Sequence, residues 1–256
     1  LILGTLFSAI VALTFSSILT PSVTVQPELT PEQIEEAKKK ELPPVQIRGG
    51  FRGEKDLFQL IWELHLQGYY EQAYDYAQRF VEEHRDSDLI VDVYYKMADI
   101  LYDWNRGSIT QQYKEARGAY EKAIAYMPDN PKVPWGEFQI ANTYFFLNVF
   151  DAAIDYYRAL IKNYPTYEYL DIAQSRLALS FLKSHQYERA ELEYKRLLEL
   201  YPESSLIRNA HFKMAEIYYR QKDLKKSIAA YKKYLEQYPH THKRLEVYFR
   251  IAKLYK

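Results

Sequence analysis

Four prolines divide the second half of this chain into segments of equal length. They stand at residues 128, 165, 202 and 239, so successive prolines are 37 residues apart, and each follows a tyrosine or a methionine. A proline interrupts a helix because it lacks an N–H and its ring clashes with the preceding turn. One period held over three successive intervals predicts a repeated unit, and periods of this size are typical of helical solenoids.

The sequence between the prolines also repeats in register. An alanine stands 13 residues after each proline, and an aromatic residue follows three residues later. The alanines are Ala141, Ala178, Ala215 and Ala252, and the aromatic residues are Tyr144, Phe181, Tyr218 and Tyr255. Small residues also stand at 153, 190 and 227, each followed four residues later by a tyrosine. Because apolar residues three and four positions apart share one face of a helix, each unit is predicted to be a pair of packed helices.

The same frame extends toward the N-terminus. Arg85 holds the proline position of an earlier unit, and a six-residue insertion around residues 104–108 shifts the second half of the next one. We expect five helix pairs and an eleventh helix that covers the last pair or begins a sixth unit. The pairs are predicted over residues 54–85, 86–128, 129–165, 166–202 and 203–239, and the eleventh helix over 242–256.

This pattern of small, large and aromatic residues closed by a proline resembles the tetratricopeptide repeat, whose usual length is about 34 residues. The resemblance covers residues 54–256 and implies an all-α, right-handed solenoid of about five helix pairs and a terminal helix. The segments Tyr201–Ser205 and Tyr218–Tyr231 are similar to bacterial envelope proteins of the β-barrel-assembly lipoprotein and cell-division coordinator types. Those families imply a periplasmic adaptor without catalytic residues.

An uncharged segment precedes the repeats. Residues 1–20 carry no charged side chain, and the first charged residue is Glu28. A helix of this length rises about 30 Å, the thickness of the hydrocarbon core of a bilayer. We therefore predict a transmembrane helix over residues 1–25, a charged linker rich in Pro and Gly over 26–53, and the solenoid over 54–256. The alternative is a secretory signal peptide, whose apolar region is shorter, about 7–15 residues.

The charges near this segment indicate its orientation. No Lys or Arg occurs before Lys38, whereas loops retained in the cytoplasm usually carry such charges close to the membrane. The repeats are therefore expected in the periplasm. The chain has no Cys to carry a lipid, which favours a single-pass anchor in the inner membrane over an outer-membrane lipoprotein.

Composition excludes several classes of function. The 34 basic and 34 acidic side chains cancel, so the chain lacks the general positive charge of a nucleic-acid-binding protein. Without Cys there is no thiolate metal site and no cysteine nucleophile. None of the six histidines stands in a metalloprotease or di-iron motif, and no phosphate-binding glycine loop or nucleophile elbow occurs. We expect no catalytic residues, no metal, no cofactor and no small-molecule substrate.

The resemblance places a partner-binding groove on the first helix of each pair. The side chains predicted to line it are Tyr95, Tyr102, Phe138, Asn142, Phe145, Arg176, Phe212, Lys213, Tyr219, Phe249 and Arg250. Aromatic rings provide large contacts at low entropic cost, as a protein-binding surface requires. The alternative is that the rings pack against neighbouring repeats and that the cations lie on a solvated helix face.

These features favour a non-catalytic, membrane-anchored scaffold outside the cytoplasm, within a bacterial envelope complex such as a flagellar or gliding motor or a secretion or pilus machine. The alternatives are an adaptor in outer-membrane protein or envelope biogenesis, a soluble secreted adaptor, and a repeat-bearing subunit of an enzyme complex. Homo-oligomeric neighbours are also a candidate partner. Residues 54–88 hold nine acids and three bases, whereas residues 211–256 hold four acids and twelve bases, so opposite ends of the array are expected to attract.

Overall fold

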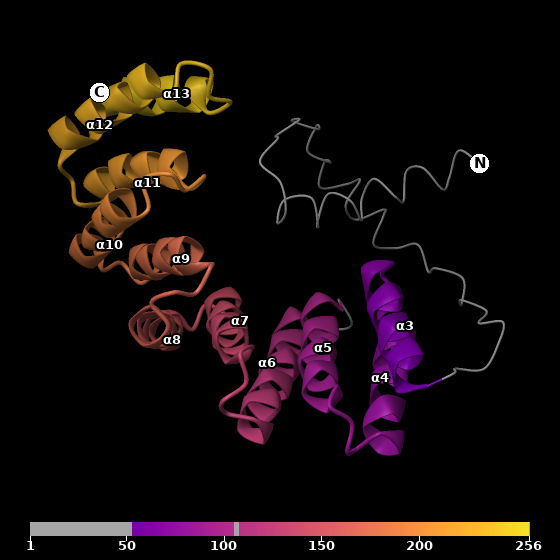
Figure 1. The fold of residues 1–256 in the computed structure, drawn as a ribbon. Helices are drawn as coiled ribbons and strands as arrows, with labels where there is room; N and C mark the ends of the chain where they lie inside the picture. Colours follow the sequence, from indigo (N-terminus) through magenta and orange to yellow (C-terminus); the bar gives the residue numbers. More distant parts are fainter. Residues whose placement is uncertain (1–52, 105–107, 256) are drawn as a thin grey trace, which may run out of the picture. The chain divides into compact units, whose positions relative to one another are not determined.

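The computed structural model describes residues 53–104 and 108–255 (Figure 1). Within these ranges the chain forms eleven α-helices and no strand, which confirms the predicted all-α repeat fold. The helices are α3 (Glu54–Leu66), α4 (Tyr70–Glu83), α5 (Ile90–Asp103), α6 (Ile109–Tyr126), α7 (Val133–Phe146), α8 (Phe150–Asn163), α9 (Leu170–Lys183), α10 (Tyr187–Leu200), α11 (Ile207–Arg220), α12 (Leu224–Gln237) and α13 (Arg244–Leu254). The chain divides into two compact units, the first ending at Gln112 and the second beginning at Tyr113.

In the first unit, α3, α4 and α5 pack against one another around a small apolar core. Helix α3 contributes Leu57, Ile61 and Leu64, all buried, at spacings that place them on one face. Two alanines of α4 are fully buried against these residues, so the helices approach closely where no side chain separates their backbones.

In the second unit, the helices from α7 onward alternate between two layers. Figure 1 shows α7, α9, α11 and α13 on one side and α8, α10 and α12 on the other. We call the first set the leading helices and the second set the following helices. Helices α7, α9 and α11 each pack against the following helix of their pair, and each following helix packs against the next leading helix. This stack is the solenoid that the repeat predicted.

The repeated small and aromatic residues form the core of this stack. Ala141, Ala178 and Ala215 have no exposed surface, and the tyrosines at 157, 194 and 231 are also buried. Ser227 replaces alanine in α12, and its hydroxyl donates to the Ala215 carbonyl oxygen at 2.9 Å. A buried hydroxyl without such a partner would destabilise the fold, so this bond explains why serine is tolerated at the position.

The prolines end the following helices, as the sequence predicts. Helices α8, α10 and α12 each stop one residue before a tyrosine, and the proline follows that tyrosine. The φ angles of Tyr164, Tyr201 and Tyr238 lie between −127° and −130°, away from the helical region. Their ψ angles lie between 56° and 67°, and a proline disfavours the helical region for the residue before it, so each helix ends where the sequence predicts.

The turns from leading to following helices contain a feature that the sequence did not reveal. Asn148, His185 and Lys222, again 37 residues apart, have φ angles of 59°, 62° and 64°. The residue after each donates its backbone N–H to the carbonyl of the repeat aromatic five residues earlier, as Val149 does to Tyr144 at 2.9 Å. Gly68 has the same role in the first unit, where Tyr69 donates to Leu64. These are left-handed helix caps, which satisfy the last carbonyls of each leading helix.

The predicted transmembrane helix over 1–25 lies outside the described residues, as does the linker over 26–53 apart from Gly53. Across residues 53–104 and 108–255, no helix is both long enough and apolar enough to span a bilayer.

Candidate protein-binding site

Five of the eleven side chains predicted to line a groove are buried within the repeats. They are Tyr95, Phe138, Asn142, Phe145 and Phe212. The ring of Phe138 lies 6.2 Å from the rings of Tyr157 and Tyr167, and that of Phe212 lies 5.8 Å from Tyr231. The ring of Phe138 therefore packs against the next repeat at Tyr167, whereas that of Phe212 packs within its own helix pair at Tyr231.

Asn142 has an internal role. Its Oδ1 accepts a hydrogen bond from the Tyr157 hydroxyl at 2.6 Å, and its Nδ2 donates to Gln139 Oε1 at 2.8 Å. All three side chains are buried. This connected polar group joins α7 to α8 and satisfies the hydrogen-bonding capacity of the amide from inside the repeat.

The basic residues on the first helix of each pair have distinct environments. In the first unit, Lys96 is buried, with its Nζ 3.1 Å from the centre of the Trp62 ring and 3.6 Å from Asp99. Beside it on α5, Tyr102 is half-buried. Lys96 therefore stabilises the packing of α3 on α5, since a cation over an indole ring is attracted to its face.

In the second unit, two of the predicted groove cations are paired with carboxylates on their own helices. Lys213 donates to Glu216 at 2.9 Å, and Arg250 donates to Glu246 at 2.9 and 2.7 Å. Burial alone would raise the pKa of Glu216, but the hydrogen bond and charge of Lys213, with the charges of Arg250 and Arg220, bring this pKa below its ordinary value.

Arg176 differs from these two residues. Its guanidinium lies 5.0 Å from the centre of the Phe145 ring and 5.2 Å from that of Phe146. In the part of the chain that the structure describes, no carboxylate pairs with it. Phe146 is 38% exposed and stacks on Tyr113 with ring centres 5.4 Å apart. The last turn of α7 and the middle of α9 thus present an arginine with its charge available beside an exposed aromatic ring.

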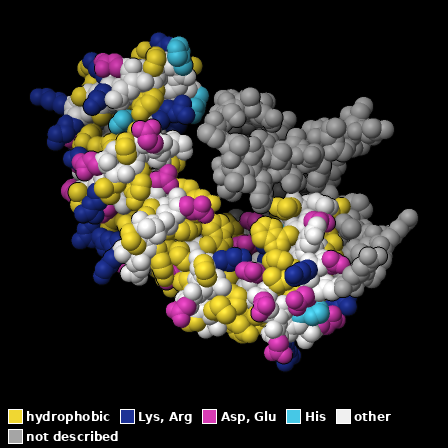
Figure 2. All heavy atoms as spheres, viewed as in Figure 1, with side chains coloured by type: hydrophobic (Ala, Val, Ile, Leu, Met, Phe, Trp, Pro, Cys, Tyr) yellow, Lys and Arg dark blue, Asp and Glu magenta, His cyan; other side chains and the backbone are white. Residues whose placement is uncertain are grey.

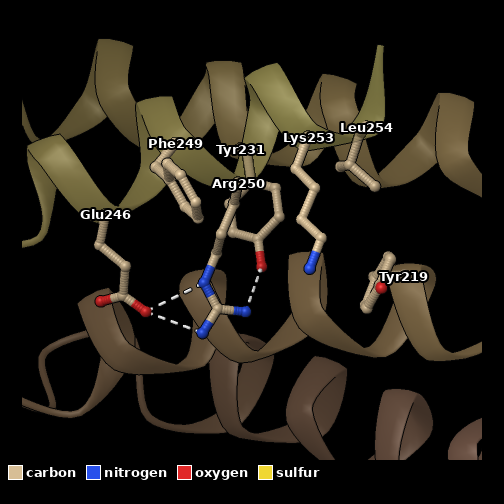
Figure 3. A pocket seen from close by; sticks show the side chains of 7 residues that line it. All are labelled: Tyr219, Tyr231, Glu246, Phe249, Arg250, Lys253 and Leu254. Atoms are coloured by element: carbon tan, nitrogen blue, oxygen red, sulfur yellow. Dashed lines mark hydrogen bonds and ion pairs between the residues drawn. The ribbon is translucent and has the colours of Figure 1, made fainter. Parts of the chain in front are cut away.

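The two predicted groove side chains that are most exposed lie at a pocket between α11 and α13 (Figure 3). Tyr219 is 39% exposed and Phe249 is 72% exposed. The pocket has a volume of about 340 Å³ and is lined by Tyr219, Tyr231, Glu246, Phe249, Arg250, Lys253 and Leu254. Figure 2 shows Lys and Arg side chains gathered at the end of the second unit that contains this pocket.

Sequence reasoning did not single out Phe146, Lys253 or Leu254 as surface contacts. Lys253 holds the same repeat position as Asn142 and Glu216, 37 residues after Glu216. The repeat spacing could therefore have identified Lys253 as a candidate groove residue. Phe146 was missed because it stands at the end of its helix, beyond the positions that the resemblance maps onto the groove. No group of three or more His, Asp and Glu side chains able to hold a metal occurs among the described residues.

Two family models for the tetratricopeptide repeat match the chain, at residues 137–167 and 175–240. These two segments match the tetratricopeptide repeat. The matched segments span α7 to α12, the same helices whose register the prolines define. No curated protein matches the chain.

Three solved structures illustrate the similarity of the fold. The MamA structure (residues 41 to the end) from Desulfovibrio magneticus RS-1 has a TM-score of 0.59 at 16% identity, covering 74% of this chain and 97% of that one. A tetratricopeptide repeat protein from Parabacteroides merdae gives 0.62 at 17% identity, with 79% and 72% covered. YrrB, described as a tetratricopeptide protein with an unusual peptide-binding site, gives 0.56 at 15% identity, with 76% and 91% covered. At these identities the likeness concerns the fold alone.

Proposed function

We propose that this tetratricopeptide protein is a non-catalytic scaffold that binds another polypeptide on the leading helices of its second unit. The observation that carries the proposal is the pairing of Arg176 with the exposed ring of Phe146. Arginine and the aromatic residues, phenylalanine included, are enriched in protein interfaces relative to the rest of the surface. The peptide-binding site named for YrrB supports the same use of the fold.

The chemistry of this surface indicates what it binds. A guanidinium without a carboxylate partner gains most from a carboxylate of the partner, with which it forms two parallel hydrogen bonds. The adjacent ring offers apolar contact area. The scaffold is therefore proposed to take a segment that carries an acidic residue next to an apolar one.

The proposal includes the location of the scaffold. Residues 1–20 anchor the chain in the inner membrane, the repeats stand in the periplasm, and the partners belong to an envelope complex such as a motility, secretion or pilus machine. The length and lack of charge of residues 1–20 and the absence of Lys or Arg before Lys38 support this arrangement. Protease treatment of intact spheroplasts tests it: the repeats should be digested from the outside, and protection of the repeats would contradict a periplasmic location.

Site-specific photo-crosslinking tests the binding surface. A photoreactive amino acid placed at Phe146 should crosslink one partner polypeptide in gently solubilised membranes, and Arg176→Glu in the same chain should abolish that product. The same amino acid at Asp155, exposed on α8 in the opposite layer, serves as the control. Equal crosslinking from positions 146 and 155 would show that the leading helices are not the binding surface.

A further inference from the structure

The pocket between α11 and α13 has apolar walls and a fixed polar edge (Figure 3). Phe249 and Leu254 extend from α13, and Tyr219 faces them from α11. Tyr231 lies behind them, almost fully buried, and its hydroxyl accepts a hydrogen bond from Arg250 Nη1 at 3.3 Å. The apolar walls favour an apolar group, because its transfer from water to this pocket is favourable.

The charged residues at the pocket are not equivalent. Glu246 accepts two hydrogen bonds from Arg250, from Nε and Nη2, and the Arg250 guanidinium also lies 5.3 Å from the centre of the Phe212 ring. Arg250 is thus held as part of the wall. Lys253 is exposed and forms no ion pair with any carboxylate that the structure describes, and Figure 3 shows its ammonium directed toward the space between Tyr231 and Tyr219. Lys253 is the cation available to a ligand.

The surroundings of the pocket carry a positive charge. Residues 211–256 hold twelve bases and four acids. Burial lowers the pKa of Lys243; the charges of Lys213 and Arg250 also lower it, whereas those of Glu246 and Glu216 raise it. A positive surface of this kind attracts acidic partners and repels basic ones.

We propose that this pocket receives one large apolar side chain, such as Trp, Phe or Leu, from an acidic segment of a partner polypeptide, while a carboxylate beside that side chain pairs with Lys253. The inference rests on the proposed scaffold function and adds a second point of attachment with its own specificity. The pocket opens along the side of two helices, and a ring of Phe249 that is 72% exposed stands at its mouth, so a side chain on a longer polypeptide has access.

A peptide series tests the proposal on the full chain. The probe is a short fluorescein-labelled peptide of Asp, Glu and Gly with one central Trp, and its binding is followed by fluorescence anisotropy. Two matched peptides carry Lys in place of the acids, or Ala in place of the Trp. The acidic Trp peptide should bind most tightly, and its affinity should fall as salt is raised because the attraction is screened.

Variants then assign the binding to the pocket. Lys253→Glu should weaken the acidic Trp peptide by about fivefold or more, since it replaces attraction by repulsion at the mouth. Phe249→Ala should weaken it by a similar factor, and because this ring is exposed the fold should persist. The control is Lys225→Glu, the same charge change at an exposed position on α12 outside the pocket lining. Circular dichroism confirms that each variant is folded.

Two results would overturn the inference. One is equal binding of the acidic and basic peptides, and the other is equal weakening by Lys253→Glu and Lys225→Glu, which would indicate a general charge effect. The scaffold proposal is tested separately at Phe146. If the partner is still crosslinked there when Lys253→Glu has no effect on peptide or partner, the pocket inference fails while the scaffold function stands.

Discussion

Phe212 and Phe249 hold the same position in successive repeats, yet Phe212 is 3% exposed and Phe249 is 72% exposed. The ring of Phe212 is enclosed by Tyr231 and Tyr234 of α12, and the Lys243 ammonium lies 4.1 Å from its centre. No described helix follows α13 to cover Phe249 in the same way. The environment of a repeat position therefore depends on the helix that follows it as well as on its own residue.

The alanines at the helix crossings provide a direct test of this dependence. Ala178 is fully buried, whereas Ala252, two repeats later at the same position, is exposed. Ala178→Leu should lower the free energy of unfolding by about 1–3 kcal/mol, because extra methylenes do not fit into a close-packed crossing. Ala252→Leu should change it by less than about 0.5 kcal/mol. Urea denaturation of both variants measures the difference, and equal effects would mean that α13 is covered on this face.

A second prediction concerns the polar group that joins α7 to α8. Tyr157→Phe removes the hydroxyl that donates to Asn142 at 2.6 Å and leaves a buried amide oxygen without that partner. The free energy of unfolding should fall by about 1–3 kcal/mol. Tyr255→Phe is the matched control, since this tyrosine is 65% exposed and its loss of a hydroxyl should be nearly neutral. If both substitutions are neutral, the hydrogen bond contributes nothing measurable.

Stability should depend on pH through His211, a half-buried residue whose Nδ1 lies 3.0 Å from the Tyr238 hydroxyl. Burial, and then the charge of Lys233, lower the pKa of His211 below its ordinary value. Between the folded-state pKa of His211 and its ordinary value of about 6.5, the unfolded chain binds more protons than the folded chain. The free energy of unfolding therefore falls as pH decreases below about 6.5. The loss continues until the folded-state pKa is reached.

Thermal unfolding at a series of pH values measures this effect. His211→Gln keeps a hydrogen-bond acceptor for Tyr238 but removes the titrating group, so its stability should decline less steeply between about pH 7 and pH 5. A slope that His211→Gln does not reduce would assign the pH dependence to other groups.

The proline register and the small residues were sufficient to predict the helix pairs. A proline disfavours helical backbone at the residue before it, and this is a local effect that one sequence reveals. The exposure of the leading-helix side chains was not predictable in the same way. Phe138, Phe212 and Phe249 look alike in the repeat, but their burial is decided by residues about 20 or 30 positions later, such as Tyr157 and Tyr167 for Phe138. The pocket arises from that difference.

The left-handed caps were also hidden in the sequence, because different residue types occupy the position. Glycine at residue 68 and asparagine at 148 are common in this conformation, but His185 and Lys222 are not. A repeat alignment by residue type therefore shows no pattern here. The shared requirement lies in the backbone, which must turn so that the next N–H reaches the carbonyl five residues earlier.

This backbone requirement leads to a stabilising substitution at Lys222, whose φ angle is 64°. A lysine in the left-handed region is strained by roughly 1–2 kcal/mol, and glycine removes this strain. Glycine also lowers the free energy of unfolding by about 0.4–1 kcal/mol, because it gives the unfolded chain more conformational freedom. Lys222→Gly should therefore raise the free energy of unfolding by about 0.5 kcal/mol, the difference between these two effects. Lys232→Gly, in the interior of α12, should instead lower it by about 1 kcal/mol. Parallel urea titrations separate the two, and a loss of stability at both positions would show that the lysine cap carries no strain to relieve.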